Sequence, residues 1–228
     1  MNAIAPALVD HLVVVAGSLA QGAAWCEEVL GVAPGPGGEH PLMGTHNRLL
    51  NISSAAFPRC FFEIIAINPQ APPHGRVRWF DMDEPALQAA VREEPRLVHF
   101  VAQTTEAARA KGALTALGID RGPLLRTSRE TPRGPLEWQI SVRADGQRLF
   151  YGGLPTLLQW EGTRPTDHMP ACGITLEALT MHHPRPEDLQ AAYAAIGLEG
   201  VGLEPGSPNL TATLRTPRGR VRIESGGV

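Results

Sequence analysis

The feature that most constrains this 228-residue chain is an internal repeat. A strand-like run carries His11 and leads into a helix-like stretch that ends in Leu-Gly-Val at 30–32. A second strand-like run carries His99, and at nearly the same spacing its helix-like stretch ends in Leu-Gly-Ile at 117–119. Self-similarity of this kind indicates a duplicated structural unit. The two histidines therefore occupy equivalent positions in two equivalent units.

Each unit has the local signals of a strand followed by a helix. In the first, Ser18 suits the N-cap of a helix, and Gly31 can take the left-handed conformation that ends one. Further strand-like runs follow, so the repeated unit is predicted to be βαβββ. A weaker third copy begins near residue 174. We therefore predict an α+β fold with modules at 1–80 and 81–168, the second including a linking helix, and a third, incomplete module at 169–228.

Composition excludes several classes of protein. Hydrophobic residues make up 43% of the chain and the formal charge is -3, which indicates a globular protein without the basic surface that nucleic acid requires. We find no apolar run long enough to cross a membrane and no secretory signal, so we expect no membrane partner and a cytoplasmic location. The three cysteines are widely spaced, which disfavours a disulfide framework or a thiolate zinc site.

One carboxylate stands out in the last predicted strand of the first unit. Glu63 lies within Phe-Phe-Glu-Ile-Ile-Ala-Ile at 61–67, and a charge buried in such a run is costly unless it is paired or bound to a cation. The corresponding strand of the second unit ends with Gln159 and Glu161, which share a face because strand side chains alternate. We choose Gln159 as the inward residue, because Glu161 adjoins Gly162 at the expected strand end.

The chain resembles the vicinal oxygen chelate superfamily, and in particular its glyoxalase-like domain family. The resemblance covers about residues 8–160, and the segments that carry it are DHLVV at 10–14, LGV at 30–32, GGEH at 37–40, GTHN at 44–47, FEIIA at 62–66, LVH at 97–99 and LLQW at 157–160. Members of that superfamily are similar in having paired βαβββ modules that curl around a cleft. A divalent metal is held there by the first and last strand of each module.

Carried over to this sequence, the resemblance implies four metal ligands, which are His11, Glu63, His99 and Gln159. Such donors suit Zn, Mn, Fe, Co or Ni. A metal with open positions binds vicinal substrate oxygens and polarises them as a Lewis acid. Gln159 departs from the glyoxalase I pattern because an amide cannot act as a base, so Glu63 has to be both ligand and base unless Glu161 reaches the site. His11, His99 and Glu63 could equally form a two-histidine, one-carboxylate iron site.

Other polar residues are candidates for contacts with a substrate. His46 could provide a proton, and His40 and Asn47 lie close to it in the sequence. Arg126 and Arg129 precede the strands of the second unit, and either could clamp a substrate carboxylate.

Two functions remain open at this point. The first is a metal-dependent lyase, isomerase or ring-cleaving dioxygenase that acts on a small molecule with vicinal oxygens. The second is a non-catalytic protein of the same fold that binds a small molecule without metal. Exposed strand edges in the third module also predict a homodimer.

Overall fold

The computed structural model describes residues 4–227, and these form a mixed α+β fold. The helices within this range are α1 Leu19–Leu30, α2 Pro85–Glu93, α3 Ala107–Ala116 and α4 Pro186–Ile196, with short 3-10 turns at Leu149–Gly152 and Pro165–Asp167. The strands are β1 Leu8–Val15, β2 Glu39–His40, β3 Thr45–Asn51, β4 Phe61–Ile67, β5 Arg96–Gln103, β6 Leu124–Arg129, β7 Leu136–Ser141, β8 Thr156–Glu161, β9 Thr175–His183, β10 Val201–Pro205, β11 Asn209–Thr216 and β12 Gly219–Glu224.

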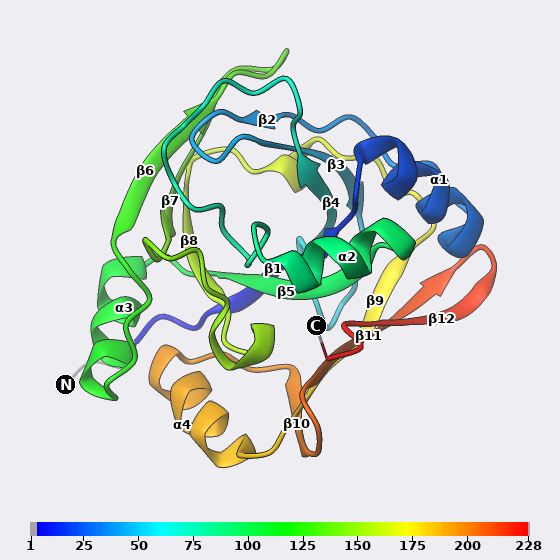
Figure 1. Ribbon diagram of the computed structural model, residues 1–228. Helices are drawn as coiled ribbons and strands as arrows, with labels where there is room; N and C mark the ends of the chain where they lie inside the picture. The colour runs from blue at the N-terminus through cyan, green and yellow to red at the C-terminus, as the bar shows by residue number, and fades with distance from the viewer. Residues whose placement is uncertain (1–3, 228) are drawn as a thin grey trace.

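The first eight strands form one sheet in the order β2-β3-β4-β1-β5-β8-β7-β6. Each half of this sheet is a βαβββ unit whose first strand pairs in parallel with its last, β1 with β4 and β5 with β8. The halves join through the antiparallel pair β1–β5. Figure 1 shows the sheet curling into an open barrel, with the β1–β5 pair between the two halves. The predicted paired-module α+β fold is confirmed.

Two β-bulges interrupt the β1–β5 pair. Val9 pairs with Ala102 but His11 pairs with Val101, so Asp10 is an extra residue in β1. Val13 pairs with His99 but Val14 pairs with Leu97, so Val98 is an extra residue in β5. A bulge of this kind redirects side chains relative to strict alternation. It therefore changes which residues near His11 and His99 reach the inside of the barrel.

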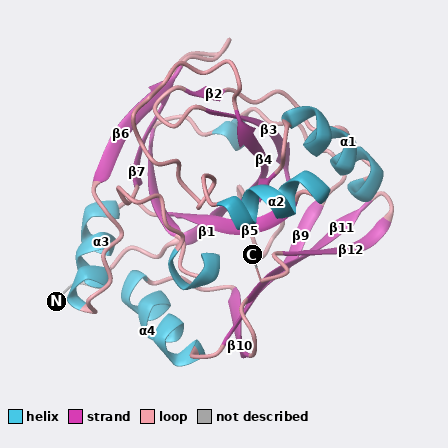
Figure 2. Cartoon of the chain, viewed as in Figure 1, coloured by secondary structure: helices cyan, strands magenta, loops and turns pink. Residues whose placement is uncertain are grey.

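The concave and convex sides of the sheet belong to separate apolar clusters. On the concave side, Val13 and Val15 of β1 pack with Leu87 and Val91 of α2, so α2 covers part of the inside of the barrel. On the convex side, Phe62 and Phe100 pack with residues of the helices and of the second sheet. Figure 2 shows α1 and α3 on the outside of the curved sheet.

The third unit is a separate four-stranded sheet in the order β10-β9-β11-β12. It has the same succession of one helix and four strands as the other units, so its elements are more complete than the sequence predicts. Its pairing differs, because β9 pairs in parallel with β10, the strand directly after the helix. The Tyr193 hydroxyl of α4 donates a hydrogen bond of 2.6 Å to the Gly153 carbonyl, which joins this unit to the second one.

Local signals account for the best predicted helix. The Ser18 side chain accepts a hydrogen bond of 3.1 Å from the Gln21 amide, and Gly31 ends α1 with φ of 78°. Both features agree with the sequence prediction. None of the helices between residues 4 and 227 has the length and apolar character needed to span a membrane.

The contact between α1 and β4 predicts opposite effects for two helical glycines. A methyl group on Gly22 would overlap Cγ2 of Ile64 and lie 3.0 Å from Cβ of Ala16. We expect Gly22→Ala to lower the free energy of unfolding by about 1–3 kcal/mol. Gly112 in α3 has open space around it, and Gly112→Ala should raise that free energy by about 0.5–1 kcal/mol through helix propensity. Urea denaturation measures both, and equal stabilisation by the two variants would contradict the packing described for α1.

Candidate active site on the concave face of the sheet

A buried pair of adjacent residues, Asp10 and His11, lies at a cavity on the concave face, and His11 forms part of the cavity wall. The bulge in β1 lets the two side chains meet, and Oδ1 of Asp10 lies 2.6 Å from Nδ1 of His11. The other carboxylate oxygen, Oδ2, accepts a hydrogen bond of 2.8 Å from Nε1 of Trp160. A carboxylate only accepts, so Nδ1 of His11 donates, and in neutral His11 the lone pair is on Nε2. The His11 ring is also stacked on Phe61, with 4.4 Å between the ring centroids.

Glu63 lies opposite His11 and is also buried. Its Oε2 is 3.6 Å from Nε2 of His11, and its Oε1 accepts a hydrogen bond of 2.6 Å from Nδ2 of Asn47. The Asn47 side chain is oriented in turn, because its Oδ1 accepts from the Gly38 amide at 2.8 Å and from Nη1 of Arg129 at 3.4 Å. The arrangement brings an imidazole, a carboxylate and a guanidinium to one place.

The cavity has a volume of about 40 Å³ and is partly open to solvent. Its polar residues are His11, His40, Asn47, Glu63 and Arg129, and its apolar walls are Leu49, Phe61, Trp138, Ile140, Leu158, Trp160 and Pro165. Strands of both modules contribute to it. The mostly apolar lining with a few polar groups is typical of a site for a small molecule.

His40 lies in this cavity as a neutral side chain. Its Nδ1 is 3.0 Å from Oγ1 of Thr45, and its ring packs edge-on against Trp79. Burial lowers the pKa of His40 to about 4, although the nearby Glu63 carboxylate acts in the opposite direction. Burial also lowers the pKa of the Arg129 guanidinium, again against the effect of Glu63.

The structure places the other predicted contact residues outside this cavity. Arg126 lies on the surface with 80% of its side chain exposed, 3.9 Å from the Glu161 carboxylate. His46 alternates with Thr45 and Asn47 on β3, and its side chain is not part of the cavity wall. Of the two arginines and two histidines considered for substrate contact, Arg129 and His40 are at the cavity and Arg126 and His46 are not.

Gln159 points to the convex side of the sheet. Its Oε1 accepts a hydrogen bond of 3.1 Å from the Ala107 amide at the start of α3. Its neighbours Leu158 and Trp160 line the cavity instead, as alternation along β8 requires. Glu161 accepts from Nε2 of Gln139 at 2.6 Å and does not line the cavity.

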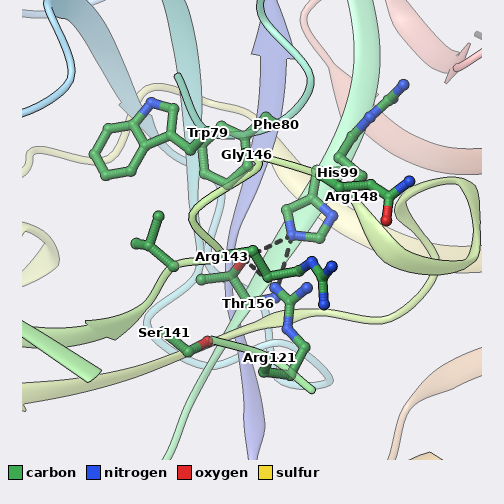
Figure 3. A pocket seen from close by; sticks show the side chains of 11 residues that line it. Trp79, Phe80, His99, Arg121, Ser141, Arg143, Gly146, Arg148 and Thr156 are labelled. Atoms are coloured by element: carbon green, nitrogen blue, oxygen red, sulfur yellow. Dashed lines mark hydrogen bonds between the residues drawn. The ribbon is translucent and has the colours of Figure 1, made fainter. Parts of the chain in front are cut away.

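His99 is fully buried on the concave side, and its ring contacts other residues of its own, second module. Nδ1 donates to the Gly152 carbonyl at 3.0 Å, and Nε2 accepts from the Thr156 amide at 3.1 Å (Figure 3). Burial holds the pKa of His99 well below its usual value, and the positive charges of Arg121 and Arg148 lower it further. Both ring nitrogens of neutral His99 are therefore engaged within the protein.

The donors implied by the resemblance thus do not meet at one point. His11 and Glu63 converge, whereas His99 and Gln159 are directed elsewhere. Within residues 4–227 no group of three or more His, Cys, Asp or Glu side chains is placed to hold a metal ion. This arrangement does not fit a centre with those four ligands.

Two residues of the site were not identified from the sequence. Strict alternation places Asp10 on the opposite face from His11, and only the bulge brings the two together. The choice of Gln159 as the inward residue of β8 places Trp160 on the outward face, but in the structure Trp160 lines the cavity and donates a hydrogen bond to Asp10. An acid directly before the histidine was the available signal.

Comparison with known proteins identifies the family. The model of the glyoxalase-like domain matches residues 9–197, which is most of the chain. The protein belongs to the glyoxalase-like domain family. This confirms the predicted resemblance. None of the curated proteins searched matches the chain.

Solved structures also match the chain. A hypothetical protein from Staphylococcus aureus is 15% identical with a TM-score of 0.59, and the match covers 97% of this chain and 87% of that one. The Mn(II)-bound glyoxalase from Novosphingobium aromaticivorans is 9% identical with a TM-score of 0.49, covering 97% and 83%. Methylmalonyl-CoA epimerase from Mycobacterium tuberculosis is 13% identical with a TM-score of 0.42, covering 72% and 94%. At these identities the likeness to the first of these establishes the fold alone.

The lowered histidine pKa values predict acid destabilisation. Unfolded histidines bind protons near pH 6.5, whereas buried neutral His99 and His40 do so only at lower pH. Their contribution to stability is therefore complete above about pH 6.5 and is lost as pH falls below it, by up to about 1.4 kcal/mol per pH unit for each histidine. We expect the free energy of unfolding to fall from pH 7 to pH 5, and His99→Gln to reduce that slope.

Denaturant titrations at a series of pH values measure this slope. Arg126→Gln is the control, because it replaces an exposed side chain outside the cavity and leaves every histidine in place, so its slope should equal that of the unmodified protein. Equal slopes for His99→Gln and the unmodified protein would show that His99 is not the titrating group.

Proposed function

We propose that this protein is an enzyme, an isomerase or lyase, that moves a proton on a small carboxylic acid with vicinal oxygens. The observation that supports this most directly is the Asp10–His11 pair, which leaves Nε2 of His11 facing the cavity 3.6 Å from Glu63. A histidine oriented through Nδ1 by a buried carboxylate is a general base with a fixed tautomer. Asp10 would also stabilise the imidazolium that forms when His11 takes up a proton.

The chain's own residues supply the roles that such a reaction needs. Nε2 of His11 accepts the proton from the carbon next to a substrate carbonyl, and Glu63, on the other side of the gap, returns or relays a proton. Arg129 offers its guanidinium to the substrate carboxylate. The apolar walls, including Trp138 and Leu158, exclude water and favour a substrate with an apolar group.

A metal-dependent enzyme with Zn, Mn, Fe, Co or Ni is the second candidate. The observation in its favour is that a histidine bound through Nδ1 to a carboxylate is typical of metal ligands, and that Glu63 is within reach of the same space. His11 and Glu63 would then be its protein ligands. A third candidate, a non-catalytic binder, uses the same cavity without proton transfer. The homodimer and the cytoplasmic location remain predictions.

The acid–base proposal predicts a large effect of Asp10. Asp10→Asn keeps the shape of the side chain but removes the charge and allows an amide N–H to face Nδ1, which places the proton of His11 on the wrong nitrogen. We expect turnover to fall about 10²- to 10⁴-fold, with a similar loss for His11→Gln. The assay is deuterium incorporation at carbon in D₂O, followed by proton NMR across a set of small 2-oxo and 2-hydroxy acids.

Asp188→Asn is the matched control, since Asp188 lies in α4 with 42% of its side chain exposed and is paired with Arg185. It should exchange deuterium at the unmodified rate. Loss of deuterium incorporation after chelator treatment, and its return with one divalent ion, would favour the metal-dependent candidate. If acids raise the melting temperature of the protein but incorporate no deuterium, the result favours the non-catalytic binder.

The two arginines that the sequence suggested for carboxylate binding predict different kinetic effects. Arg129→Gln removes a charged donor from the cavity wall, and we expect KM to rise about 10- to 100-fold with a smaller change in kcat. Arg126→Gln changes an exposed residue and should leave both constants unchanged. Equal effects of the two variants, in steady-state kinetics on the best acid, would contradict the role given to Arg129.

A further inference from the structure

A second cavity lies on the concave side of the sheet, in the half formed by the second module. Its wall includes His99, Thr156, Arg121, Arg143, Arg148 and Gln147, and it shares no lining residue with the candidate active site. Figure 3 shows the Arg121 side chain extending toward Thr156 and the His99 ring. The enclosed space is close to that of one water molecule or monatomic ion.

Arg121 is a buried cation without a carboxylate partner among the described residues. It is 3% exposed, and Nη2 donates to the neutral hydroxyl of Thr156 at 2.5 Å. Its Nε and Nη1 are buried and have no hydrogen-bond partner. Leaving a buried guanidinium in this state is costly, because an unpaired buried charge destabilises a protein. An anion bound at Nε or at Nη1 would reduce that cost.

The neighbouring acids are not available to Arg121. Arg143 is bound to Asp145 at 2.9 and 2.6 Å, and Arg148 is bound to Asp81 at 2.9 Å. The Asp120 side chain accepts from the Gly122 amide at 2.8 Å. Each carboxylate in the vicinity therefore already has a donor of its own.

Burial and a neighbouring positive charge both disfavour the Arg121 guanidinium. Burial lowers the pKa of Arg121 to about 10, repulsion from Arg143 lowers it further, and the Asp120 and Asp145 carboxylates act in the opposite direction. The neighbouring His99 is neutral and its ring nitrogens are engaged, so it neither supplies nor needs a counter-charge. What the Arg121 guanidinium lacks is a hydrogen-bond acceptor at Nε and at Nη1.

We propose that this cavity is a binding site for a monatomic halide ion, which accepts a hydrogen bond from Nε or Nη1 of Arg121. A halide provides one negative charge in a space of about one water molecule, whereas the three heavy atoms of formate exceed that space. Bound there, the halide neutralises Arg121 between α3, β7 and β8 and stabilises the second module. The site is independent of the proposed catalysis.

Thermal unfolding with chloride and formate tests the proposal. The protein is first dialysed into a buffer whose only added salt is sodium gluconate, an anion too large for the cavity. Replacing gluconate by chloride at constant ionic strength should raise the melting temperature with saturation, by about 5–10 °C at 100 times the dissociation constant. Replacing gluconate by formate, which is larger than the cavity, should leave the melting temperature unchanged.

Arg121→Met provides the matched variant, because it keeps the length of the side chain and removes the charge. Its melting temperature should not respond to the exchange of anions, whereas Arg126→Met, at an exposed site, should respond as the unmodified protein does. If Arg121→Met does not fold, anomalous diffraction from crystals of the unmodified protein grown with bromide or soaked in it decides, with a peak expected next to Nε or Nη1 of Arg121.

Two results would overturn the proposal. The first is a melting temperature that is the same in gluconate, chloride and formate. The second is a bromide map without a peak at Arg121 together with an unchanged response to anions in Arg121→Met. Neither result would bear on the Asp10–His11 proposal, which is tested by deuterium exchange.

Discussion

The antiparallel pairing of β1 with β5 is the interaction on which both candidate sites depend. It joins the two βαβββ halves into one curved sheet, and its two bulges determine which residues turn inward. The bulge at Asp10 allows a buried carboxylate to contact the imidazole of the next residue, which lines the cavity. The bulge at Val98 lies next to His99, whose ring is held by residues of the second module. One ladder of hydrogen bonds therefore sets the chemistry of two separate places.

Much of the fold follows from patterns that are local in the sequence. The repeated strand, cap, helix and glycine stop predict the paired modules, because each signal acts within a few residues. Glu63 could also be identified, since a carboxylate in an apolar strand needs a partner wherever the strand lies, and the structure supplies Asn47 and leaves His11 close by. The third unit was harder, because its strand order depends on long-range pairing.

The parts of the site that could not be predicted depend on shifts of a single residue. Period-two alternation separates Asp10 from His11, and the bulge in β1 is not visible in composition or spacing. The choice of Gln159 as an inward residue required knowing which face of β8 turns toward the cavity, and the Ala107 amide at the start of α3 holds that side chain on the other face. His99 has the expected position, but Gly152 and Thr156 engage its ring nitrogens. Repeat position thus identified the right strands, although it did not fix where the side chains point.

The two bulges also constrain how this chain can change length over evolutionary time. Asp10 shifts the register of the ladder by one residue and Val98, on the other strand, shifts it back, so that both ends of the β1–β5 pair lie in the same frame. Loss of either residue alone would leave half of the ladder out of frame and turn its side chains to the opposite face. An insertion or deletion at one of these two positions is therefore expected to be accompanied by one at the other. The lengths of β1 and β5 are thus coupled, although the two strands belong to different modules.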